Sequence, residues 1–355
     1  MPARDTATRQ AAVSVIIPAR NEEACLGACL QSLVTQAGVP FEIIVVDDHS
    51  TDRTREIASS FSSSPSPYRV RIIDAAPLPA GWTGKNNAVT AGSRTAHGDW
   101  LLFTDADTLH LPGSLAHSLE EAQRRGAAML SYSPEQVVKG FWEKAVMPVI
   151  FAELAATFRP SQVSDSNSPA AAANGQYILI TREAYDAVGG HTAVAGDLLE
   201  DVALARAVKR SGRKIFFRFG GDAVRTRMYR TFAQLREGWT KNLALLFPSP
   251  LRLAALRAIE FVLILAGFAI AVATALRGHW QPAMVAGILG LILYTFLLAR
   301  IRRAHFSWDA SLLALLGLPL FSYLLLRSAR AHANGSVPWK GRTYSGETYL
   351  LATLH

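Results

Sequence analysis

Cysteine is scarce in this chain of 355 residues, which has only Cys25 and Cys29. Their spacing of four residues puts both on one face of a predicted helix, without the geometry that a disulfide prefers. No zinc-binding spacing surrounds them. We therefore expect two reduced packing residues, and the sequence argues against a disulfide-stabilised fold or a cysteine-ligated zinc site.

The first residues are not expected to form a secretory leader. The chain begins "MPARDTATRQAAVSVIIPARNEE", which has no long apolar core between a basic start and a small-residue cleavage site. We expect the N-terminal part to stay in the cytoplasm.

Two common nucleotide-binding signatures are absent as well. No G-x-G-x-x-G follows the first predicted strand, and "GWTGKNNA" has the wrong glycine spacing and no Ser or Thr after Lys85 for a P-loop. The sequence therefore argues against a dinucleotide dehydrogenase and a P-loop NTPase.

Apolar residues, by contrast, are abundant: they make up 50% of the chain, and the mean hydropathy is +0.17. Three apolar stretches of 17 or 18 residues follow Pro250, at 259–276, 283–299 and 310–326. About 20 residues are needed to cross a bilayer, so each is near the lower limit. We expect membrane helices, because three such stretches with arginine between them are unusual for the alternative, a soluble core.

The net charge of +8 has one main source. Residues 206–257 hold thirteen Lys or Arg against two acids, Asp222 and Glu237. Nucleic acid, a phosphorylated substrate or anionic lipid would each suit such a stretch. The apolar segments directly after it favour lipid, and no nucleic-acid-binding motif accompanies the charge.

The charges do not settle the membrane topology. Basic residues follow both the second and the third apolar stretch, and the positive-inside rule places both groups in the cytoplasm: Arg300, Arg302, Arg303, Arg327, Arg330, Lys340 and Arg342. Three full spans cannot put both the N-terminal domain and the tail inside. We therefore expect one stretch to lie in the interface or to re-enter, and the one containing Glu260 is the candidate.

The first half of the chain alternates β-branched runs with helical stretches. This pattern predicts an α/β fold with a mostly parallel sheet, covered on both faces. The expected strands are 13–19, 41–48, 69–75, 100–107, 127–133, 176–182 and 214–219, with helices from about Asn21, Asp52 and Lys85 and over 198–212. The small, polar stretch 160–175 reads as a mobile loop.

Acids stand where ligands bind in such sheets, beyond the carboxyl ends of strands. Asp47 and Asp48 end the second predicted strand, and the run "LLFTDADT" ends the fourth with Asp105 and Asp107. A hard divalent ion takes oxygen ligands from one or two carboxylates and from bound phosphates. Alternate residues of a strand face opposite sides, so the chain must turn here for both acids to converge.

Five motifs in order carry a family resemblance: "VIIPARNEE", "IIVVDDHSTDRT", "GWTGKNNA", "FTDADT" and "LLEDVALARAVKRSG". Together they resemble a family 2 glycosyltransferase of the GT-A fold over roughly residues 12–247. The stretches "LPAGWTGKNNA", "ANGQYILI" and "GGH" and the C-terminal apolar segments are most similar to enzymes that glycosylate membrane lipids, such as the chlorobactene and hopene-associated glycosyltransferases.

The resemblance implies roles for the donor-side residues. Asp107 would bind Mg2+ or Mn2+, and Asp105 would contact the metal or the nucleoside. One of Asp47 and Asp48, with Asp48 favoured, would accept a hydrogen bond from uracil or ribose, while Asp52 is better explained as a helix N-cap. The other wall of the base pocket would come from Pro18, Ala19 and Glu22.

The phosphates and the acceptor need further groups. Lys85 would place a point charge against the diphosphate, an ordinary surface lysine being the alternative. Asp201 matches the family's catalytic base, and a helix dipole would favour its ionised form. Glu200 would position rather than react, and the resemblance implies one in-line displacement with inversion.

Processive polysaccharide synthases of this family carry Q-x-x-R-W, whereas "QLREGW" has Gln234, Arg236 and Trp239 at a different spacing. A processive polymerase is thus disfavoured. Arg236 and Trp239 are candidates for the membrane-side acceptor entrance, with interfacial anchoring as the alternative. His191 is a candidate near the acceptor, with a structural histidine as its alternative.

Taken together, the sequence predicts a cytoplasmic glycosyltransferase domain over 1–250, a membrane domain over 251–330 and a tail over 331–355. The expected protein is a multi-pass protein of the cytoplasmic membrane that moves a hexose, with UDP-glucose as the expected donor, to an apolar lipid resembling a carotenoid or hopanoid. Two alternatives stay open: a polyprenyl-phosphate glycosyltransferase, and a non-catalytic membrane-anchored binder of nucleotide sugars.

Overall fold

The computed structural model describes residues 11–62 and 69–344 and divides the chain into two compact units. Unit 1 holds the chain up to Val137 together with Phe158–Arg227. Unit 2 holds Val138–Thr157 and everything from Met228 onward. The chain therefore leaves unit 1 at residue 138, returns to it at 158 and leaves again at 228, so residues well before 250 group with the apolar helices.

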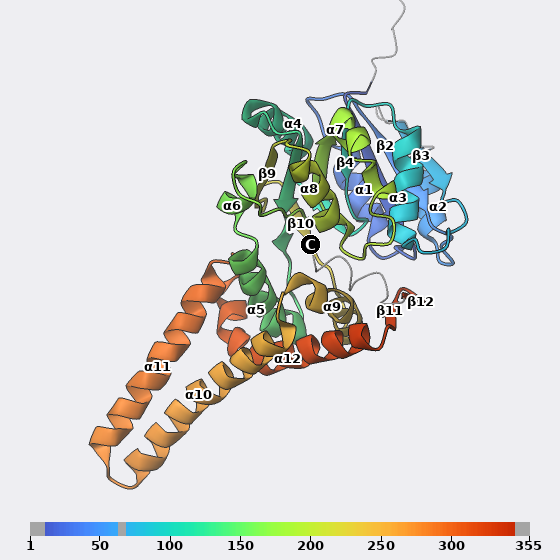
Figure 1. The fold of residues 1–355 in the computed structure, drawn as a ribbon. Coiled ribbons are helices and arrows are strands. Elements are labelled where there is room, and N and C mark those ends of the chain that lie inside the picture. Colours follow the sequence, from blue (N-terminus) through green and yellow to red (C-terminus); the bar gives the residue numbers. More distant parts are fainter. Residues whose placement is uncertain (1–10, 63–68, 345–355) are drawn as a thin grey trace, which may run out of the picture. The chain divides into compact units, whose positions relative to one another are not determined.

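Unit 1 is built on a seven-stranded sheet of order β3-β2-β1-β4-β8-β6-β9 (Figure 1). All neighbouring pairs are parallel except those that β8 makes with β4 and β6. The mostly parallel sheet is confirmed; the antiparallel β8 was not foreseen. Its strands are β1 (Val13–Ala19), β2 (Phe41–Asp47), β3 (Arg69–Asp74), β4 (Trp100–Phe103), β6 (Met129–Ser133), β8 (Ile178–Thr181) and β9 (Ile215–Phe219).

A smaller sheet joins three short strands that are far apart in the sequence. Its order is β5-β10-β7, with β10 antiparallel to β5 and parallel to β7. The strands are β5 (Thr108–His110), β7 (Glu135–Gln136) and β10 (Val224–Thr226). Because β5 follows β4 after only four residues, this sheet fixes the segment that carries Asp105 and Asp107.

Helices cover both faces of the large sheet, as the continuous apolar strands require. Alternate residues of each central strand serve the two faces: Val15 and Ile17 pack with α1, α2 and α4, whereas Ile16 packs with α3 and α8. The helices of unit 1 are α1 (Leu26–Val34), α2 (Thr54–Ser62), α3 (Gly84–Thr95), α4 (Ser114–Arg125), α6 (Pro160–Ser164), α7 (Arg182–Ala187), η1 (Gly190–Thr192) and α8 (Glu200–Arg210).

Three local expectations need correction. The predicted strand 100–107 ends at Phe103, because the chain turns before the acids. Cys25 precedes α1 rather than sharing a helical face with Cys29, although both are free thiols as expected. The stretch 160–175 is not a mobile surface loop throughout: it begins with α6, and its residues 171–173 are buried alanines.

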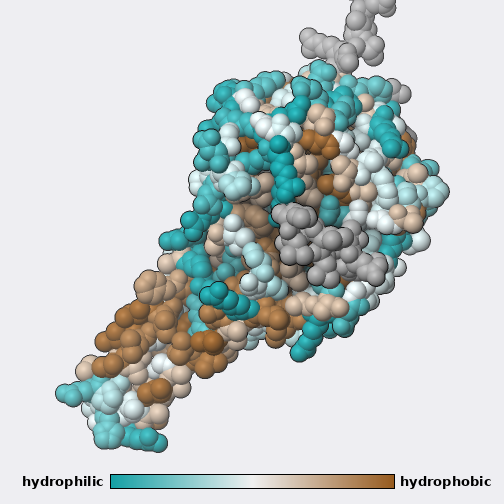
Figure 2. Space-filling model, viewed as in Figure 1, coloured by the Kyte–Doolittle hydropathy of each residue, from teal (hydrophilic) through white to brown (hydrophobic). Residues whose placement is uncertain are grey.

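Unit 2 consists of five helices and a two-stranded hairpin among its described residues. These are α5 (Phe141–Thr157), α9 (Phe232–Leu246), α10 (Pro250–Leu276), α11 (Trp280–Arg302), α12 (Trp308–Ala333), β11 (Val337–Trp339) and β12 (Arg342–Tyr344). Helices α10, α11 and α12 are long and apolar enough to cross a membrane. Figure 1 shows α10 and α11 side by side, and Figure 2 shows the apolar surface that they present.

Candidate active site

The two acids of the "DAD" stretch lie in a turn between β4 and β5. The Thr108 amide donates to the Asp105 carbonyl over 3.2 Å, which closes the turn. From the neighbouring elements, the Thr226 hydroxyl donates to the Asp107 carbonyl over 3.3 Å, and the Gln176 side chain donates to that same hydroxyl. The small sheet and the segment before β8 therefore hold the turn in place.

Lys85 lies opposite this turn, in the first turn of α3. The helix begins there because the Thr83 side chain caps it by accepting a hydrogen bond from the Asn86 amide. The Lys85 ammonium is 2.8 Å from Asp105 Oδ1 and 2.8 Å from Glu200 Oε1. Burial alone would lower the pKa of Lys85, but the neighbouring carboxylates raise this pKa well above its ordinary value.

Asp201 stands beside this cluster, at the second residue of α8. Its two oxygens accept hydrogen bonds of 2.8 Å from the amides of Gly175 and Val202. Burial and the adjacent Glu200 charge nevertheless raise the pKa of Asp201 to about 6, against the opposing effects of Lys85 and the two amides. The helix dipole expected to favour the ionised form is thus opposed by burial and by a like charge, and the carboxylate is still mostly ionised at neutral pH.

Gly175 is a site residue whose role the sequence did not indicate. A Cβ at this position would lie 2.8 Å from the Lys85 ammonium and 3.5 Å from Asp201 Oδ2. A side chain here would displace the Lys85 ammonium from its present position, whereas glycine leaves it in place beside the backbone amide that donates to Asp201. No local sequence pattern predicts this role, because Asp201 and Lys85 lie 26 and 90 positions away from Gly175 in the sequence.

Asn86 is a second residue whose role was missed, although "GKNNA" was one of the family motifs. Its buried side-chain amide donates to the carbonyls of Val194, Ala195 and Asp197. These contacts fix the segment that leads into α8, and so set the position of Glu200 and Asp201 relative to Lys85.

A small cavity opens between these groups, and it is lined in part by Pro18, Lys85, Asp105, Gly175, His191 and Glu200. His191 is buried and exchanges hydrogen bonds with Tyr185, whose hydroxyl lies 3.0 Å from Nδ1 and accepts from the His191 amide. Burial lowers the pKa of His191 to about 4. The ring is thus a neutral, structurally held wall of the cavity.

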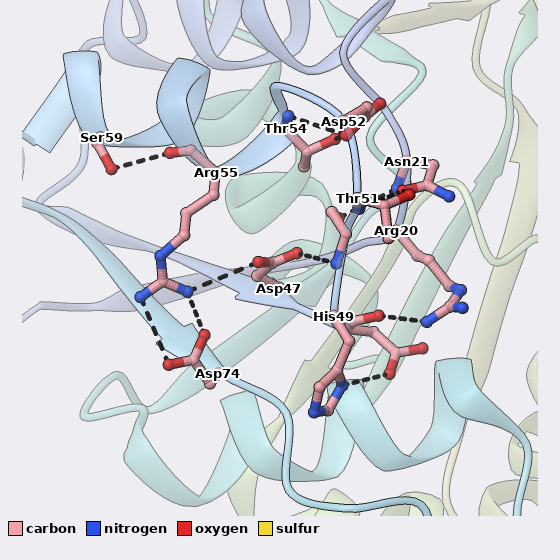
Figure 3. A network of polar contacts seen from close by, with 12 residues as sticks. Arg20, Asn21, Asp47, His49, Thr51, Asp52, Thr54, Arg55, Ser59 and Asp74 are labelled. Carbon is pink, nitrogen blue, oxygen red and sulfur yellow. Dashed lines mark hydrogen bonds and ion pairs between the residues drawn. The ribbon is translucent and has the colours of Figure 1, made fainter.

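The ends of β1, β2 and β3 form a neighbouring polar region (Figure 3). Ala19, Asp47 and Asp74 are register partners at these ends. Asp47 accepts from the Ser50 amide and faces Arg55 over 3.6 Å, and Arg55 also binds Asp74. Asp48 is buried beside them, and its amide donates to the Ala19 carbonyl.

Two further expectations concern this region. Asp52 accepts hydrogen bonds from the amides of Thr54 and Glu23, but α2 begins at Thr54 and the Arg53 carbonyl accepts its first helical bond, so Arg53 rather than Asp52 stands at the N-cap position. Glu22 donates its amide to the Thr54 hydroxyl, which ties the segment after β1 to the same helix. Asp74 and Arg55 were not singled out from the sequence.

No three His, Cys, Asp or Glu side chains within 11–62 and 69–344 are grouped so that they alone could hold a metal ion. An ion that binds bridging phosphates needs only one or two protein carboxylates. The turn with Asp105 and Asp107 supplies two, and their negative charges add to burial in raising the pKa of Cys29 beneath the turn. The residues therefore fit a divalent ion that arrives with a diphosphate.

Arg236 and Trp239 belong to α9 in unit 2. Trp239 is a buried core residue that donates to Met147 Sδ over 3.3 Å, whereas Arg236 is exposed. The packing of Trp239 favours a structural role for it over one at an open entrance.

An open, mostly parallel sheet with a carboxylate cluster beyond its strand ends is the arrangement of GT-A glycosyltransferases. Residues 14–189 match the sequence model of the family described as Glycosyl transferase family 2, so the chain carries a family 2 glycosyltransferase domain. The resemblance seen in the motifs is confirmed.

Relatives and solved structures agree with this assignment. The chain is 31% identical over 242 residues to the 4,4'-diaponeurosporenoate glycosyltransferase of Staphylococcus aureus strain USA300, and 32% identical over 241 residues to the protein of the same name from strain MRSA252. Each match covers 66% of this chain and 61% of the relative, so the chain spans about three fifths of the relatives' length.

Among solved structures, the fold matches a mannosyltransferase from Pyrobaculum calidifontis in complex with GDP-Man and Mn2+. The TM-score is 0.52 and the sequence identity 17%, over 91% of this chain and 87% of the other. This likeness supports the fold.

Proposed function

We propose that this protein is a membrane-attached, metal-dependent, inverting glycosyltransferase that moves a hexose from UDP-glucose to a carboxyl or hydroxyl group of an apolar, carotenoid-like or hopanoid-like lipid. The observation that carries the proposal is the cluster around Lys85. Asp105 after β4, Gly175 and Glu200 in α8 line one cavity with Lys85, and the Gly175 amide binds Asp201 beside it, although these residues come from distant parts of the chain.

The donor's nucleoside is assigned to the ends of β1 and β2. We assign the base or ribose contact to Asp48, as the family resemblance favours. Asp47 accepts from the Ser50 amide and faces Arg55, and Asp48 Oδ1 lies 3.4 Å from His49 Nδ1. Pro18, Ala19 and Glu22 form the opposite wall in this proposal.

The diphosphate is assigned to the cavity beside the "DAD" turn. Asp105 and Asp107 would hold Mg2+ or Mn2+, which would neutralise the charge that develops on the leaving diphosphate. Lys85, now bound to Asp105 and Glu200, supplies a further positive charge for the phosphates. Glu200 positions Lys85 and does not react.

Asp201 is the proposed general base that takes the proton of a hydroxyl acceptor. The amides of Gly175 and Val202 fix both of its oxygens, so the carboxylate is oriented before the acceptor binds. A pKa of about 6 leaves Asp201 mostly ionised at neutral pH, yet basic enough to accept a proton.

The acceptor class follows from the relatives' name and from the apolar helices. The Staphylococcus aureus proteins are named for 4,4'-diaponeurosporenoate, a carboxylate by its name. Helices α10–α12 would keep unit 1 at the cytoplasmic membrane, where such a lipid dissolves. His191 would shape the acceptor side of the cavity, and Arg236 and Trp239 of α9 would lie toward the membrane-side entrance.

The test uses purified full-length protein with UDP-glucose, Mn2+ and a membrane lipid extract. We expect UDP release coupled to a glycosylated lipid detected by mass spectrometry, with loss of both in the absence of divalent metal. Asp201→Asn should abolish transfer to a hydroxyl acceptor, whereas a carboxylate acceptor has no proton to lose and depends less on a base. Asp186→Asn, an exposed carboxyl in α7, is the matched control and should behave as the wild type.

Other outcomes contradict the proposal in distinct ways. Transfer to polyprenyl phosphate that survives Asp201→Asn would favour the polyprenyl-phosphate alternative, because a phosphate acceptor needs less help from a base. Metal-dependent binding of UDP-glucose without turnover on any lipid would favour a non-catalytic binder.

A further inference from the structure

The apolar helices of unit 2 fall into two kinds. Of the apolar 18-residue stretch in each helix, only 6% is buried in α10 and 17% in α11, whereas 50% is buried in α12. Of the three, α12 is therefore the one that is largely covered by protein. The inference drawn from this difference rests on the proposed attachment to a membrane.

Helices α10 and α11 form a pair suited to lipid. Gly267 and Gly290 bring the two backbones together, since a Cβ on Gly267 would lie 2.8 Å from the Gly290 Cα, and small residues of this kind let membrane helices pack closely. Around this contact, the exposed side chains are large and apolar, among them Leu263, Ile270 and Ile288 (Figure 2).

The α10–α11 pair is also bounded by charge at both ends. At the connection between the helices, Arg277 and His279 are exposed, next to the exposed Trp280. At the other end, Glu260 of α10 binds Arg300 of α11 over 2.8 Å. The segment of α11 between Trp280 and Arg300 is about 30 Å long at 1.5 Å per residue, close to the thickness of a hydrocarbon core.

Helix α12 instead runs in a different direction from this pair and lies along α9 (Figure 1). Polar contacts hold both of its ends to α5 and α9. Near its start, Asp309 pairs with Lys144 of α5 over 2.6 Å. Near its end, the Ser328 hydroxyl donates to the Thr240 carbonyl and accepts from the Ala244 amide of α9.

Two of the helices packed on α12, α5 and α9, cannot cross a bilayer; α10 contacts α12 as well, where the Ser322 hydroxyl donates to the Ala254 carbonyl near the start of α10. Both ends of α5 continue directly into unit 1, so this helix begins and ends on the same side of the membrane. Helix α9 is 15 residues long, about 23 Å, and carries Arg236, Glu237 and Lys241. A helix held at both ends by α5 and α9 therefore stays on the side of unit 1.

The uncovered face of α12 is apolar. Its exposed large side chains are Trp308, Leu312, Leu316, Tyr323 and Leu326, which recur at helical spacing on one side of the helix. A helix with one face on protein and a single apolar stripe outward suits a position in the plane of the membrane interface.

We infer that only α10 and α11 cross the membrane, as a two-span hairpin, and that α12 lies in the interface with its apolar stripe in the lipid of the leaflet nearest unit 1. The hairpin β11–β12 then returns to the side of unit 1. This arrangement resolves the conflict in the positive-inside rule, because the basic residues after α11 and α12 share one side and only Arg277 lies at the far tip. The interfacial stretch is α12 and not the one containing Glu260.

Cysteine labelling of the full chain tests the arrangement. In a Cys25→Ser background, which leaves only the buried Cys29, single cysteines replace Ser60 in α2, His279 at the tip and Ser336 after α12, all three exposed. A membrane-impermeant maleimide is applied to intact spheroplasts and to inverted membrane vesicles, with the background chain as the blank.

We expect His279→Cys to label in spheroplasts, and Ser60→Cys and Ser336→Cys to label only in inverted vesicles. Labelling of Ser336→Cys together with His279→Cys in spheroplasts would mean that α12 crosses, which overturns the inference. Labelling of His279→Cys on the same side as Ser60→Cys would mean that the α10–α11 pair does not cross, which also overturns it.

A depth measurement keeps the inference testable if a variant folds poorly. Spin labels at Leu312, Leu316 and Leu326 should report similar shallow depths in bilayers, whereas a crossing α12 would carry Leu316 toward the bilayer centre and separate the depths. Neither readout depends on sugar transfer. Correct topology without transfer would contradict only the proposed function, and transfer with a crossing α12 would contradict only the topology.

Discussion

Both units hold a partly buried cluster of charged side chains, but the two clusters are balanced differently. In unit 1, the single Lys85 cation faces Asp105, Glu200 and Asp201. In unit 2, two arginines face two glutamates: Arg257 and Arg300 each pair with Glu153 and Glu260. The unit 2 cluster is neutral by itself, whereas the unit 1 cluster has more negative than positive charge.

This difference distinguishes a ligand-binding site from a structural joint, by which we mean a charge-balanced cluster that holds helices together. Burying charge is costly unless partners compensate it, so a balanced group of four can serve to join α5, α10 and α11. Around Lys85, by contrast, burial together with the neighbouring Glu200 charge raises the pKa of Asp201, and the excess of carboxylates can accommodate a further cation. The predictions below change one charge, or the space around it, in each unit.

The largest effect is expected from Asp201→Asn. The change keeps the shape of the side chain but removes the proposed base, whose contribution is typically 10²–10⁴-fold, so we expect kcat to fall by roughly 10³-fold. Steady-state UDP release with a saturating lipid that carries a hydroxyl acceptor measures it, and Asp186→Asn should leave kcat unchanged. Retention of more than a tenth of the wild-type kcat would contradict the role of Asp201.

The next largest effect concerns unit 2. Arg300→Met leaves Glu153 and Glu260 facing only Arg257, and loss of one partner from a buried ion pair costs about 3 kcal/mol of unfolding free energy. The double variant Arg300→Met with Glu260→Gln restores the balance and should regain most of this stability. Thermal unfolding in nanodiscs compares them, with Arg277→Met at the exposed tip as control; a double variant no more stable than the single one would argue against a balanced joint.

Features of the fold that depend on local sequence could be predicted, whereas features that depend on contacts between distant segments could not. Strands β1, β2 and β3 were placed to within a residue, because continuous β-branched runs bounded by turn residues are local signals. The candidate acids were found for a similar reason, since strand ends in a parallel sheet meet at one edge. The antiparallel β8 and the small sheet depend on pairing between distant segments, such as Leu109 with Arg225, which no local pattern encodes.

The same limit applies to the site. Lys85 was singled out for a diphosphate, but its pairing with Glu200 depends on how Asn86 fixes the segment before α8. The shifted pKa of Asp201 follows from burial, which only the folded chain defines. Gly175 has no visible role until Lys85 and Asp201 are seen on either side of it.

A smaller effect should follow from Gly175→Ala. The added methyl would meet the Lys85 ammonium at 2.8 Å, so the lysine has to move away from its two carboxylates. We expect kcat/KM for the donor to fall about thirtyfold, since a loss of about 2 kcal/mol corresponds to that factor. Gly27→Ala is the matched control, because its Cβ would make only an ordinary contact at 3.5 Å; equal activity of the two variants would show that the space at Gly175 is not needed.

The pH dependence should report the charge excess in unit 1. With the pKa of Asp201 near 6, kcat/KM should fall about tenfold per pH unit below that value, as the base becomes protonated. Because the Glu200 charge helps to raise this pKa, Glu200→Gln should move the inflection to lower pH, and Lys85→Met should move it to higher pH. Inflections that coincide in all three proteins would assign the titration to another group.

The smallest effect is a gain in stability from the variant that loses most activity. The pKa of Asp201 is raised on folding from about 3.9, so its contribution to stability is fully present below pH 4 and is lost as the pH rises through about 6. Asp201→Asn stays neutral throughout. Unfolding at pH 8 should therefore require about 1 kcal/mol more than in the wild type, a partial gain because the amide cannot accept both backbone hydrogen bonds, whereas at pH 4.5 the difference should vanish or change sign. An equal loss of stability at both pH values would mean that the surroundings of Asp201 do not destabilise its negative charge. The carboxylate excess in unit 1 would then be as well compensated as the joint in unit 2.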